Sequence, residues 1–243
     1  KKIKKICKSY SAKKGEKESW YSRNIKQLIY KLIKLKFSKF MDDIIILNLE
    51  RKKKFNNIAN KIFNKKSYLV HIDSYYNPIG DSGVLPWHVD QAYDGDKKEH
   101  ESFVNPDHAM IKFFIYLTNV GPDNGCTSYI PKSQKIAYAV RKGIYEGILK
   151  YEPHFMLKDF RKFISKEANT NFIKKHLNDD NVINDFLEKT NFIEKGDTKE
   201  FDYSLNSGDA IIFDEGGVHK ASRCLHSDRL VLRFLYSTVK SQK

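Results

Sequence analysis

The stretch WHVDQ, residues 87–91, decides how the rest of this sequence is interpreted. Side chains point alternately to the two faces of a β-strand, so His88 and Asp90 project from the same face if these residues form a strand. A third candidate ligand, His219, lies far downstream in the stretch GGVHKAS. Two imidazoles and one carboxylate suit non-haem Fe(II) and leave coordination positions open for other ligands. We therefore predict that His88, Asp90 and His219 bind one metal ion.

Two arginines follow His219 in an apolar run. The stretch HSDRLVLRFLY places Arg229 ten residues after His219, and Arg233 four residues later. If this run is a strand, both arginines lie on one face, because side chains at even spacing share a face. A guanidinium group binds a carboxylate through two parallel charge-assisted hydrogen bonds. The metal ligands and these arginines together predict iron and an anionic organic cosubstrate.

Four segments of the chain, in this order, resemble the motifs of one known family. WHVDQ resembles the proximal metal-ligand motif, and residues 115–135, IYLTNVGPDNGCTSYIPKSQK, resemble the strand, Asn-Gly turn and Pro-x-Ser segment that follow it. Residues 205–222, LNSGDAIIFDEGGVHKAS, resemble the Gly-Asp strand with the distal histidine, and Arg229 falls where the family anchors 2-oxoglutarate. This is the phytanoyl-CoA dioxygenase-like (PhyH) family of Fe(II)- and 2-oxoglutarate-dependent oxygenases. One departure is KSQ at residues 132–134, where the family often has Gly-Ser-His, at the rim of the site.

The resemblance implies the cofactors Fe(2+) and 2-oxoglutarate, and a hydroxylation that consumes O2 and releases succinate and CO2. The substrate that it implies is a small molecule or an acyl compound. By this resemblance His88, Asp90 and His219 are the catalytic metal ligands, and Arg229 pairs with the far carboxylate of 2-oxoglutarate. Arg233 is left with two roles, since it could assist Arg229 or meet an anionic substrate. Because an aspartate fills position 90, hydroxylation, desaturation or ring formation is favoured over halogenation.

The resemblance also implies a mainly β fold with flanking helices, namely a double-stranded β-helix, the cupin-like jelly-roll barrel. A length of 243 residues, 40% of them hydrophobic, suits one such domain. Hydrophobic periodicity predicts a basic helical N-terminal part, residues 1–66, that packs on the barrel, and a jelly-roll core over residues 67–243. A helical insertion is expected at about residues 135–198, where the family has a segment that caps the barrel mouth. We predict one structural domain overall.

The net charge of +14 is unevenly distributed along the chain. Residues 1–70 hold 21 of the 44 Lys and Arg but only 5 of the 30 Asp and Glu, so residues 71–243 hold the remaining 23 and 25. Because the predicted catalytic part has no basic excess, this distribution argues against nucleic acid as a partner. Two alternative functions stay open: a nucleic-acid-associated protein that uses the basic part, and a catalytically inactive metal-binding interaction module.

The basic residues of the N-terminal part alternate with apolar ones. Lys31, Lys34, Lys36 and Lys39 are interleaved with Leu, Ile and Phe. This pattern predicts an amphipathic helix with a solvated basic face. The alternative is that the basic stretch recruits an anionic substrate or surface.

The composition also bears on location. No apolar run reaches the ~18 residues that a helix needs to cross a bilayer, so no membrane span is predicted. The three cysteines, Cys7, Cys126 and Cys224, are few and lack metal-type spacing. Such a sparse, odd set favours a reduced, cytoplasmic location. The expected partners are O2 and a small-molecule substrate, and the oligomeric state stays open.

Other histidines and aspartates suit the metal site less well than His88, Asp90 and His219. His71-Ile72-Asp73 is a second His-x-Asp on an expected strand, and we predict that it borders the cosubstrate pocket without binding metal. His226 lies too close to Arg229 to replace His219. Asp94 and Asp96 are interpreted as solvated loop residues. The remaining histidines are expected at the surface: His100, His108, His154 and His176.

Overall fold

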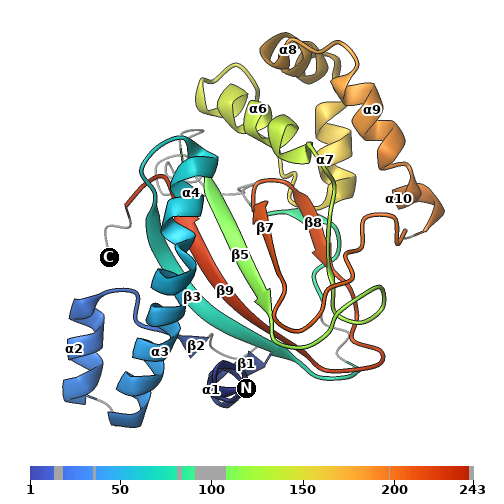
Figure 1. Cartoon of the computed structure of the whole chain (residues 1–243). Helices are drawn as coiled ribbons and strands as arrows, with labels where there is room; N and C mark the ends of the chain where they lie inside the picture. Colours follow the sequence, from blue (N-terminus) through green and yellow to red (C-terminus); the bar gives the residue numbers. More distant parts are fainter. Residues whose placement is uncertain (14–18, 35–36, 81–83, 91–107, 197, 241–243) are drawn as a thin grey trace.

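The computed structural model describes residues 1–243 except 14–18, 35–36, 81–83, 91–107, 197 and 241–243. Two β-sheets form the centre of the molecule (Figure 1). The larger sheet has the order β1-β3-β9-β5-β7, with β2 paired to β3, and the smaller has the order β4-β8-β6. The strands of the larger sheet are β1 (Ala12–Lys13), β2 (Ser19–Trp20), β3 (Tyr68–Asn77), β5 (Met110–Tyr116), β7 (Ala210–Asp214) and β9 (Arg229–Ser237). Those of the smaller sheet are β4 (His88–Val89), β6 (Thr127–Tyr129) and β8 (Val218–Ala221).

From β3 to β9 the chain alternates between the two sheets, one strand at a time. This alternation is the topology of a double-stranded β-helix, so the predicted jelly-roll fold is confirmed. Side chains from both sheets, including Phe114, Phe213 and Tyr129, pack together between them. Residues 201–205 contribute two isolated bridges, Ser128 to Asp202 and Val120 to Leu205.

The larger sheet separates two faces by the alternation of its side chains. On its outer face, Leu232 and Phe234 of β9 and Phe113 of β5 join an apolar cluster with the N-terminal helices. Phe55 is central there, since its ring lies 5.1 Å from that of Phe113 and 5.3 Å from that of Phe234. The helices are α1 (Lys2–Tyr10), α2 (Ile25–Lys34), α3 (Phe37–Lys53) and α4 (Phe55–Phe63). On the inner face, polar residues such as Arg229 and Arg233 alternate with these apolar ones, so they lie inside the barrel.

The second group of helices covers the outer face of the smaller sheet (Figure 1). These helices are α6 (Ser133–Tyr145), α7 (Leu157–Ile164), α8 (Glu167–Leu177), α9 (Val182–Lys189) and α10 (Phe192–Lys195). Their apolar sides pack on Val89, Val218 and Ile130. The segment before α7 also runs beside β4, because the Val89 N–H donates to the Phe155 carbonyl at 2.9 Å. The insertion therefore buries one face of the smaller sheet and leaves the other to the barrel interior.

The N-terminal part, the cysteines and the helix lengths can also be compared with the sequence predictions. The N-terminal part contains two short strands, β1 and β2, besides its helices, and both pair with β3. All three cysteines are buried free thiols. Among the helices formed by the described residues, none combines the length and the apolarity that crossing a bilayer requires.

Candidate metal centre

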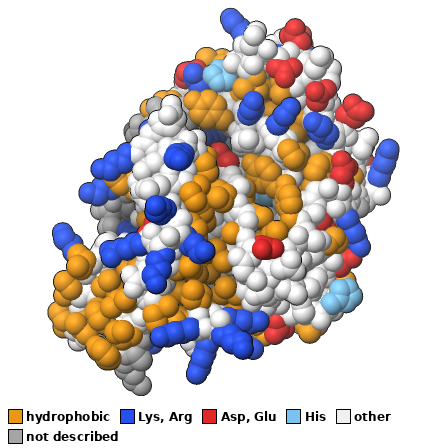
Figure 2. Space-filling view, in the orientation of Figure 1, with side chains coloured by type: hydrophobic (Ala, Val, Ile, Leu, Met, Phe, Trp, Pro, Cys, Tyr) orange, Lys and Arg blue, Asp and Glu red, His pale blue; other side chains and the backbone are white. Residues whose placement is uncertain are grey.

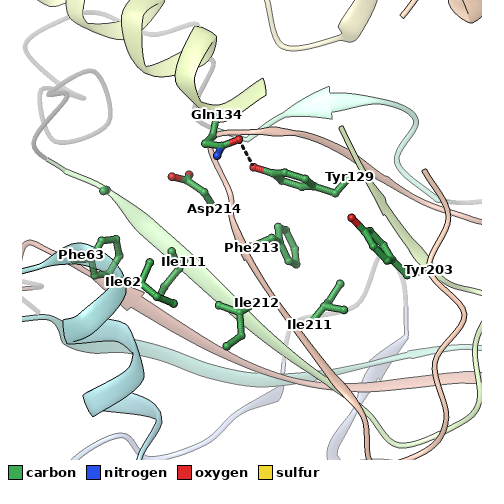
Figure 3. Close-up of a pocket in the computed structure, with 11 residues that line it drawn as sticks. Ile62, Phe63, Ile111, Tyr129, Gln134, Tyr203, Ile211, Ile212, Phe213 and Asp214 are labelled. Atoms are coloured by element: carbon green, nitrogen blue, oxygen red, sulfur yellow. Dashed lines mark hydrogen bonds between the residues drawn. The ribbon is translucent and has the colours of Figure 1, made fainter. Parts of the chain in front are cut away.

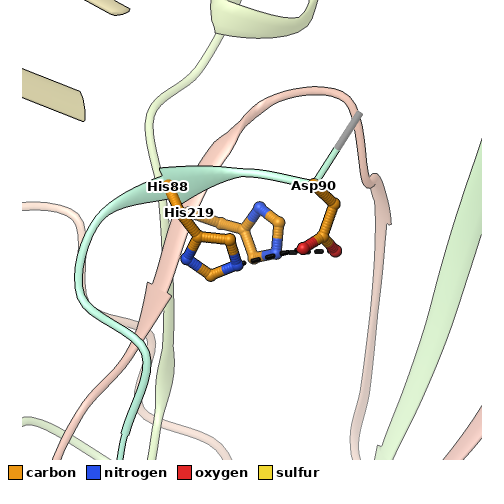
Figure 4. Close-up of side chains that lie close together, drawn as sticks. All are labelled: His88, Asp90 and His219. Atoms are coloured by element: carbon orange, nitrogen blue, oxygen red, sulfur yellow. Dashed lines mark ion pairs between the residues drawn. The ribbon is translucent and has the colours of Figure 1, made fainter. Parts of the chain in front are cut away.

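Two neighbouring strands of the smaller sheet bring the predicted metal ligands together. β4 and β8 pair antiparallel, with His88 directly opposite His219 and Val89 opposite Val218. Because the two valines are buried under the helical insertion, the period of two turns both histidines to the barrel interior. Asp90 follows β4 and completes the group (Figure 4). One ligand atom from each of His88, Asp90 and His219 lies within 4.8 Å of the others.

The hydrogen bonds of the two imidazoles decide which nitrogen faces the centre. Nδ1 of His88 lies 2.6 Å from the carbonyl oxygen of Pro86, and Nδ1 of His219 lies 2.8 Å from that of Gly217. A carbonyl can only accept, so each Nδ1 donates, and in the neutral tautomer Nε2 presents its lone pair to the centre. Such backbone contacts orient histidine ligands in metal sites.

The third ligand lies against both imidazoles. Oδ1 of Asp90 is 3.1 Å from Nε2 of His88, and Oδ2 of Asp90 is 3.4 Å from Nε2 of His219. Burial lowers the pKa of His219, which favours the neutral imidazole that a metal requires. Three acceptor groups thus converge inside the barrel, and this donor set fits a divalent cation of the Fe(II) type.

A lysine that the sequence analysis did not single out lies against this centre. Lys112 of β5 is 5% exposed, and its Nζ contacts Asp90 Oδ2 and lies 3.5 Å from Oε2 of Glu215. Burial disfavours the charged form of Asp90, but the Lys112 ammonium holds the pKa of Asp90 well below its usual range. Burial raises the pKa of Glu215. The available signal was the single charged residue in the apolar stretch AMIKFFIYL, since lysines are rarely buried without a partner.

Local backbone features hold β8 in place. A Cβ on Gly217 would lie 2.0 Å from Oη of Tyr129, so only glycine fits immediately before the strand that carries His219. The Val218 N–H donates to Oγ of Ser133 at 2.8 Å. Lys132, where the family often has glycine, adopts φ 72°, a left-handed conformation that glycine adopts at lower cost. The departure at residues 132–134 therefore leaves the support of His219 intact.

Arg229 lies inside the barrel without a carboxylate partner among the described residues. Its residue exposure is 7%, and its buried Nε has no hydrogen-bond partner in the part of the chain that the structure describes. The guanidinium carbon lies 6.0 Å from the ring centroid of Phe114 and 5.9 Å from that of Tyr116. Gly125, at φ +73°, makes room, because a Cβ there would lie 2.9 Å from Cβ of Arg229. A buried guanidinium with an unsatisfied donor is an arrangement that a carboxylate would complete.

Arg233 occupies a different environment on the same strand. Its Nε donates to Oδ1 of Asp73 at 2.8 Å, and its Nη2 donates to Oδ2 at 2.6 Å. Nε2 of His71 lies 3.2 Å from the same carboxylate, and Asp73 is fully buried. An anion at Arg233 would therefore have to compete with Asp73. The second His-x-Asp pair is thus joined to this arginine and is not part of the group formed by His88, Asp90 and His219.

Comparison with known proteins places the chain in a family. A sequence model of the phytanoyl-CoA dioxygenase (PhyH) family matches residues 4–229. The chain belongs to this family. No similar protein was found among the curated proteins.

Three solved structures illustrate the relation of this PhyH family member to known proteins. AviO1 from Streptomyces viridochromogenes Tue57 is 13% identical over 81% of this chain and 62% of that chain, with a TM-score of 0.44. HygX from Streptomyces hygroscopicus with iron bound is 17% identical over 79% and 66%, with a TM-score of 0.47. HygX with nickel and 2-oxoglutarate bound is 16% identical over the same shares, again with a TM-score of 0.47. The chain thus spans less than two thirds of the length of these proteins.

The other candidate ligands of this PhyH family member lie elsewhere. His226 is exposed. His154 is 3% exposed and stacks on Phe163 with ring centroids 5.0 Å apart, so its predicted surface position is wrong. Burial lowers the pKa of His154, as expected for an imidazole in an apolar core. Asp94, Asp96 and His100 lie outside the described residues.

An apolar pocket of about 510 Å³ lies beside the edge strand β7 (Figure 3). Ile62 and Phe63 of α4 line it on one side, and Tyr129 and Phe213 line it on the other. The Phe213 ring also packs against that of His219, with centroids 5.3 Å apart. Phe213 therefore forms a wall between this pocket and the metal centre.

Proposed function

We propose that this chain is an Fe(II)- and 2-oxoglutarate-dependent dioxygenase that hydroxylates an organic substrate and releases succinate and CO2. The observation that carries the proposal is the convergence of His88, Asp90 and His219 within one barrel that also contains the unpaired Arg229. Membership of the PhyH family supports the same activity. A metal site alone would fit many functions, but a metal site beside a buried carboxylate-binding group is specific to few.

His88 and His219 would hold the iron through Nε2, and Asp90 through one carboxylate oxygen. The metal, when bound, supplies the activation of O2 that the protein side chains cannot perform. The backbone carbonyls of Pro86 and Gly217 keep the imidazoles in the required orientation. Lys112 pairs with Asp90, so it would help to hold the carboxylate in position for coordination.

Arg229 would bind the distal carboxylate of 2-oxoglutarate. Burying an unpaired guanidinium is costly, and a carboxylate in a fork-to-fork arrangement offsets that cost. The rings of Phe114 and Tyr116 flank the guanidinium and restrict its orientation. We assign no cosubstrate role to Arg233, because Asp73 already occupies the donors on one edge of its guanidinium.

For the primary substrate we propose a small molecule with an apolar portion, which includes acyl-type compounds. The apolar pocket beside β7 supports this class, since most of its lining residues are aliphatic or aromatic. Phe213, which contacts both the pocket and His219, would control how far such a group extends toward the metal. Asp214 and Gln134 on the rim provide polar contacts for a substrate headgroup.

The test uses protein loaded anaerobically with Fe(II). Addition of 2-oxoglutarate should produce the visible charge-transfer band of the chelate, and O2 should then yield succinate, with more succinate in the presence of a true substrate. A panel of small apolar acids, acyl thioesters and aromatic compounds would identify the substrate class. Metal binding without a charge-transfer band and without succinate under any condition would refute the proposed activity and favour the inactive metal-binding module.

A further inference from the structure

The N-terminal helical hairpin carries an exposed apolar surface. Of the sixteen large hydrophobic residues that are exposed in the described chain, six lie between positions 25 and 37 and are 44% to 75% exposed. Five of the six lie on α2, and we call them the α2 face: Ile25, Ile29, Tyr30, Leu32 and Ile33; the sixth, Phe37, begins α3. Such a concentration on one small element marks an interaction surface, because single exposed hydrophobic residues are normally scattered.

The exposed residues of α2 lie on the side of the helix that points away from its contacts with the rest of the protein. Ile25, Ile29 and Ile33 recur every four residues and form one stripe along α2. The opposite side of the helix is already used, since Leu28 packs in the apolar cluster under the larger sheet and Lys31 Nζ lies 2.6 Å from the buried Asp43. α2 is therefore anchored by one side and presents its apolar stripe outward at the edge of the molecule (Figures 1 and 2).

The charged residues of α2 itself are all basic. Residues 19–41 contain six Lys and Arg and no Asp or Glu; of the two aspartates that follow, Asp43 is buried and pairs with Lys31. Lys26 lies one helical turn from Ile29 and Tyr30 and is exposed. Lys39 of the neighbouring α3 is also exposed, with its Nζ 5.2 Å from the centroid of the Tyr10 ring. A second copy of the chain would bring a like-charged rim against this one, so self-association through this face is opposed by repulsion. The complementary partner is both apolar and anionic.

We propose that the α2 face docks this protein onto an anionic phospholipid surface. The side chains project from a helix rather than line a groove, which suits insertion at the boundary between headgroups and acyl chains. The surrounding lysines would then lie at the level of the lipid phosphates. The proposal is independent of the oxygenase activity, because the α2 face and the metal centre share no residue.

The direct test is co-sedimentation of the full chain with vesicles. Binding to phosphatidylcholine vesicles that contain phosphatidylglycerol should exceed binding to pure phosphatidylcholine about tenfold or more, given the number of basic residues at the surface. Raising the ionic strength should weaken binding, because the electrostatic part is screened. Equal binding to both vesicle types, or no binding to either, would overturn the proposal.

Two variants separate the apolar and the electrostatic parts. The double substitution Ile29→Ser and Ile33→Ser should lower binding to anionic vesicles about tenfold, since it removes inserted apolar area. Ile148→Ser with Leu225→Ser is the matched control, because these residues are 59% and 49% exposed outside the hairpin, and it should leave binding unchanged.

The charge variant Lys26→Glu with Lys39→Glu should abolish the preference for anionic vesicles, whereas Lys175→Glu with Lys189→Glu should not. All four positions are exposed, and retained thermal unfolding verifies each fold. If light scattering instead found a dimer that the Ile29 and Ile33 variant dissociates, the occupant would be a second copy. Capture of an acidic protein with unchanged vesicle binding in the variants would likewise exclude the lipid surface.

Discussion

Two of the three His-x-Asp patterns in the chain lie on or beside barrel strands, and they have different outcomes; the third is His226-Ser227-Asp228. His71-Ile72-Asp73 lies on β3 of the larger sheet, and His88-Val89-Asp90 lies on and just after β4 of the smaller sheet. Across from Asp73, strand β9 presents Arg233. Across from His88, strand β8 presents His219. The pattern alone does not determine the chemistry. The neighbouring strand decides whether the carboxylate forms a bidentate ion pair or lies beside a second histidine, where it can bind a metal.

Burial follows the same distinction. The Asp73 side chain is fully buried, whereas that of Asp90 is 25% exposed toward the barrel interior. A buried bidentate pair such as Asp73 with Arg233 is a structural element that requires both partners. Asp90 also has a cationic neighbour in Lys112, but a single ammonium leaves its other oxygen free to face His88.

The largest expected effect concerns metal binding at the two patterns. His88→Ala, Asp90→Ala or His219→Ala should each abolish turnover and prevent stoichiometric binding of Fe(II), because a facial site with two protein ligands holds the metal poorly. His71→Ala is the matched control on β3 and should retain the metal. Anaerobic titration with Fe(II) or Co(II) measures both. Loss of metal in His71→Ala together with retention in His88→Ala would reverse the ligand assignment.

For thermal stability the ranking of the two patterns should be reversed: the β3 pattern should matter more than an exposed ion pair. Asp73→Asn removes the charge of a fully buried carboxylate that pairs with Arg233, at a cost of about 3–5 kcal/mol of unfolding free energy. For a chain of this size that cost lowers the Tm by roughly 6–20 °C. Glu152→Gln, which breaks the exposed pair with Lys166, is the control and should leave the Tm unchanged. Scanning calorimetry of the two variants compares them, and equal Tm values would contradict a structural role for Asp73.

The two arginines of β9 sharpen the comparison further. Arg229→Ala should raise the KM for 2-oxoglutarate roughly 30-fold or more. The reason is that the variant leaves a buried carboxylate unpaired, at a cost of about 2–5 kcal/mol of binding free energy. Arg229→Lys should have a smaller effect, because it keeps the charge but loses the bidentate fork. Arg233→Ala should mainly lower stability. Titration of the charge-transfer band with 2-oxoglutarate distinguishes these cases, and a greater binding defect in Arg233→Ala would exchange the two roles.

Much of this arrangement was accessible from the sequence. The apolar, β-branched and aromatic runs predicted β3, β5, β7 and β9, because these strands are buried on at least one face. The spacing of two in WHVDQ placed His88 and Asp90 on one side, and the family motifs supplied His219. These features are local or follow from a fixed order of motifs, so no knowledge of strand register was needed.

The partners across strands were not accessible. Arg233 lies opposite Asp73 only through the register of β3 and β9, and Lys112 lies beside Asp90 only because the two sheets face each other; no local pattern specifies either arrangement. The prediction of a solvated basic face was wrong for Lys31, which pairs with the buried Asp43 across two helices. The structure does not describe Lys36 or the Lys34 side chain. His154 was also misplaced, although the three residues that follow it, Phe155, Met156 and Leu157, are apolar.

Acid should remove part of the difference between the wild type and Asp73→Asn. Burial would raise the pKa of Asp73, but the contacts with His71 and Arg233 outweigh it and hold the pKa below the usual value. A depressed folded pKa contributes stability above the unfolded value of about 3.9, and this contribution is lost as the pH falls through the folded pKa. The stability gap should therefore be widest near neutral pH and narrow below pH of about 4. Urea unfolding across this range tests it, and a constant gap would exclude the linkage.

The smallest effect is expected at the basic N-terminal part. Lys34, Lys36 and Lys39 lie in a segment remote in sequence from every metal-centre residue, and charges separated by more than a Debye length of ~8 Å interact weakly at physiological salt. Replacing these three residues by serine should leave 2-oxoglutarate turnover without substrate nearly unchanged. Lys31 is excluded from the set, because its loss would leave Asp43 buried and unpaired and would lower stability instead. A large fall in turnover at an unchanged Tm would mean that the basic N-terminal part contributes directly to the active site, which would then not be confined to the barrel.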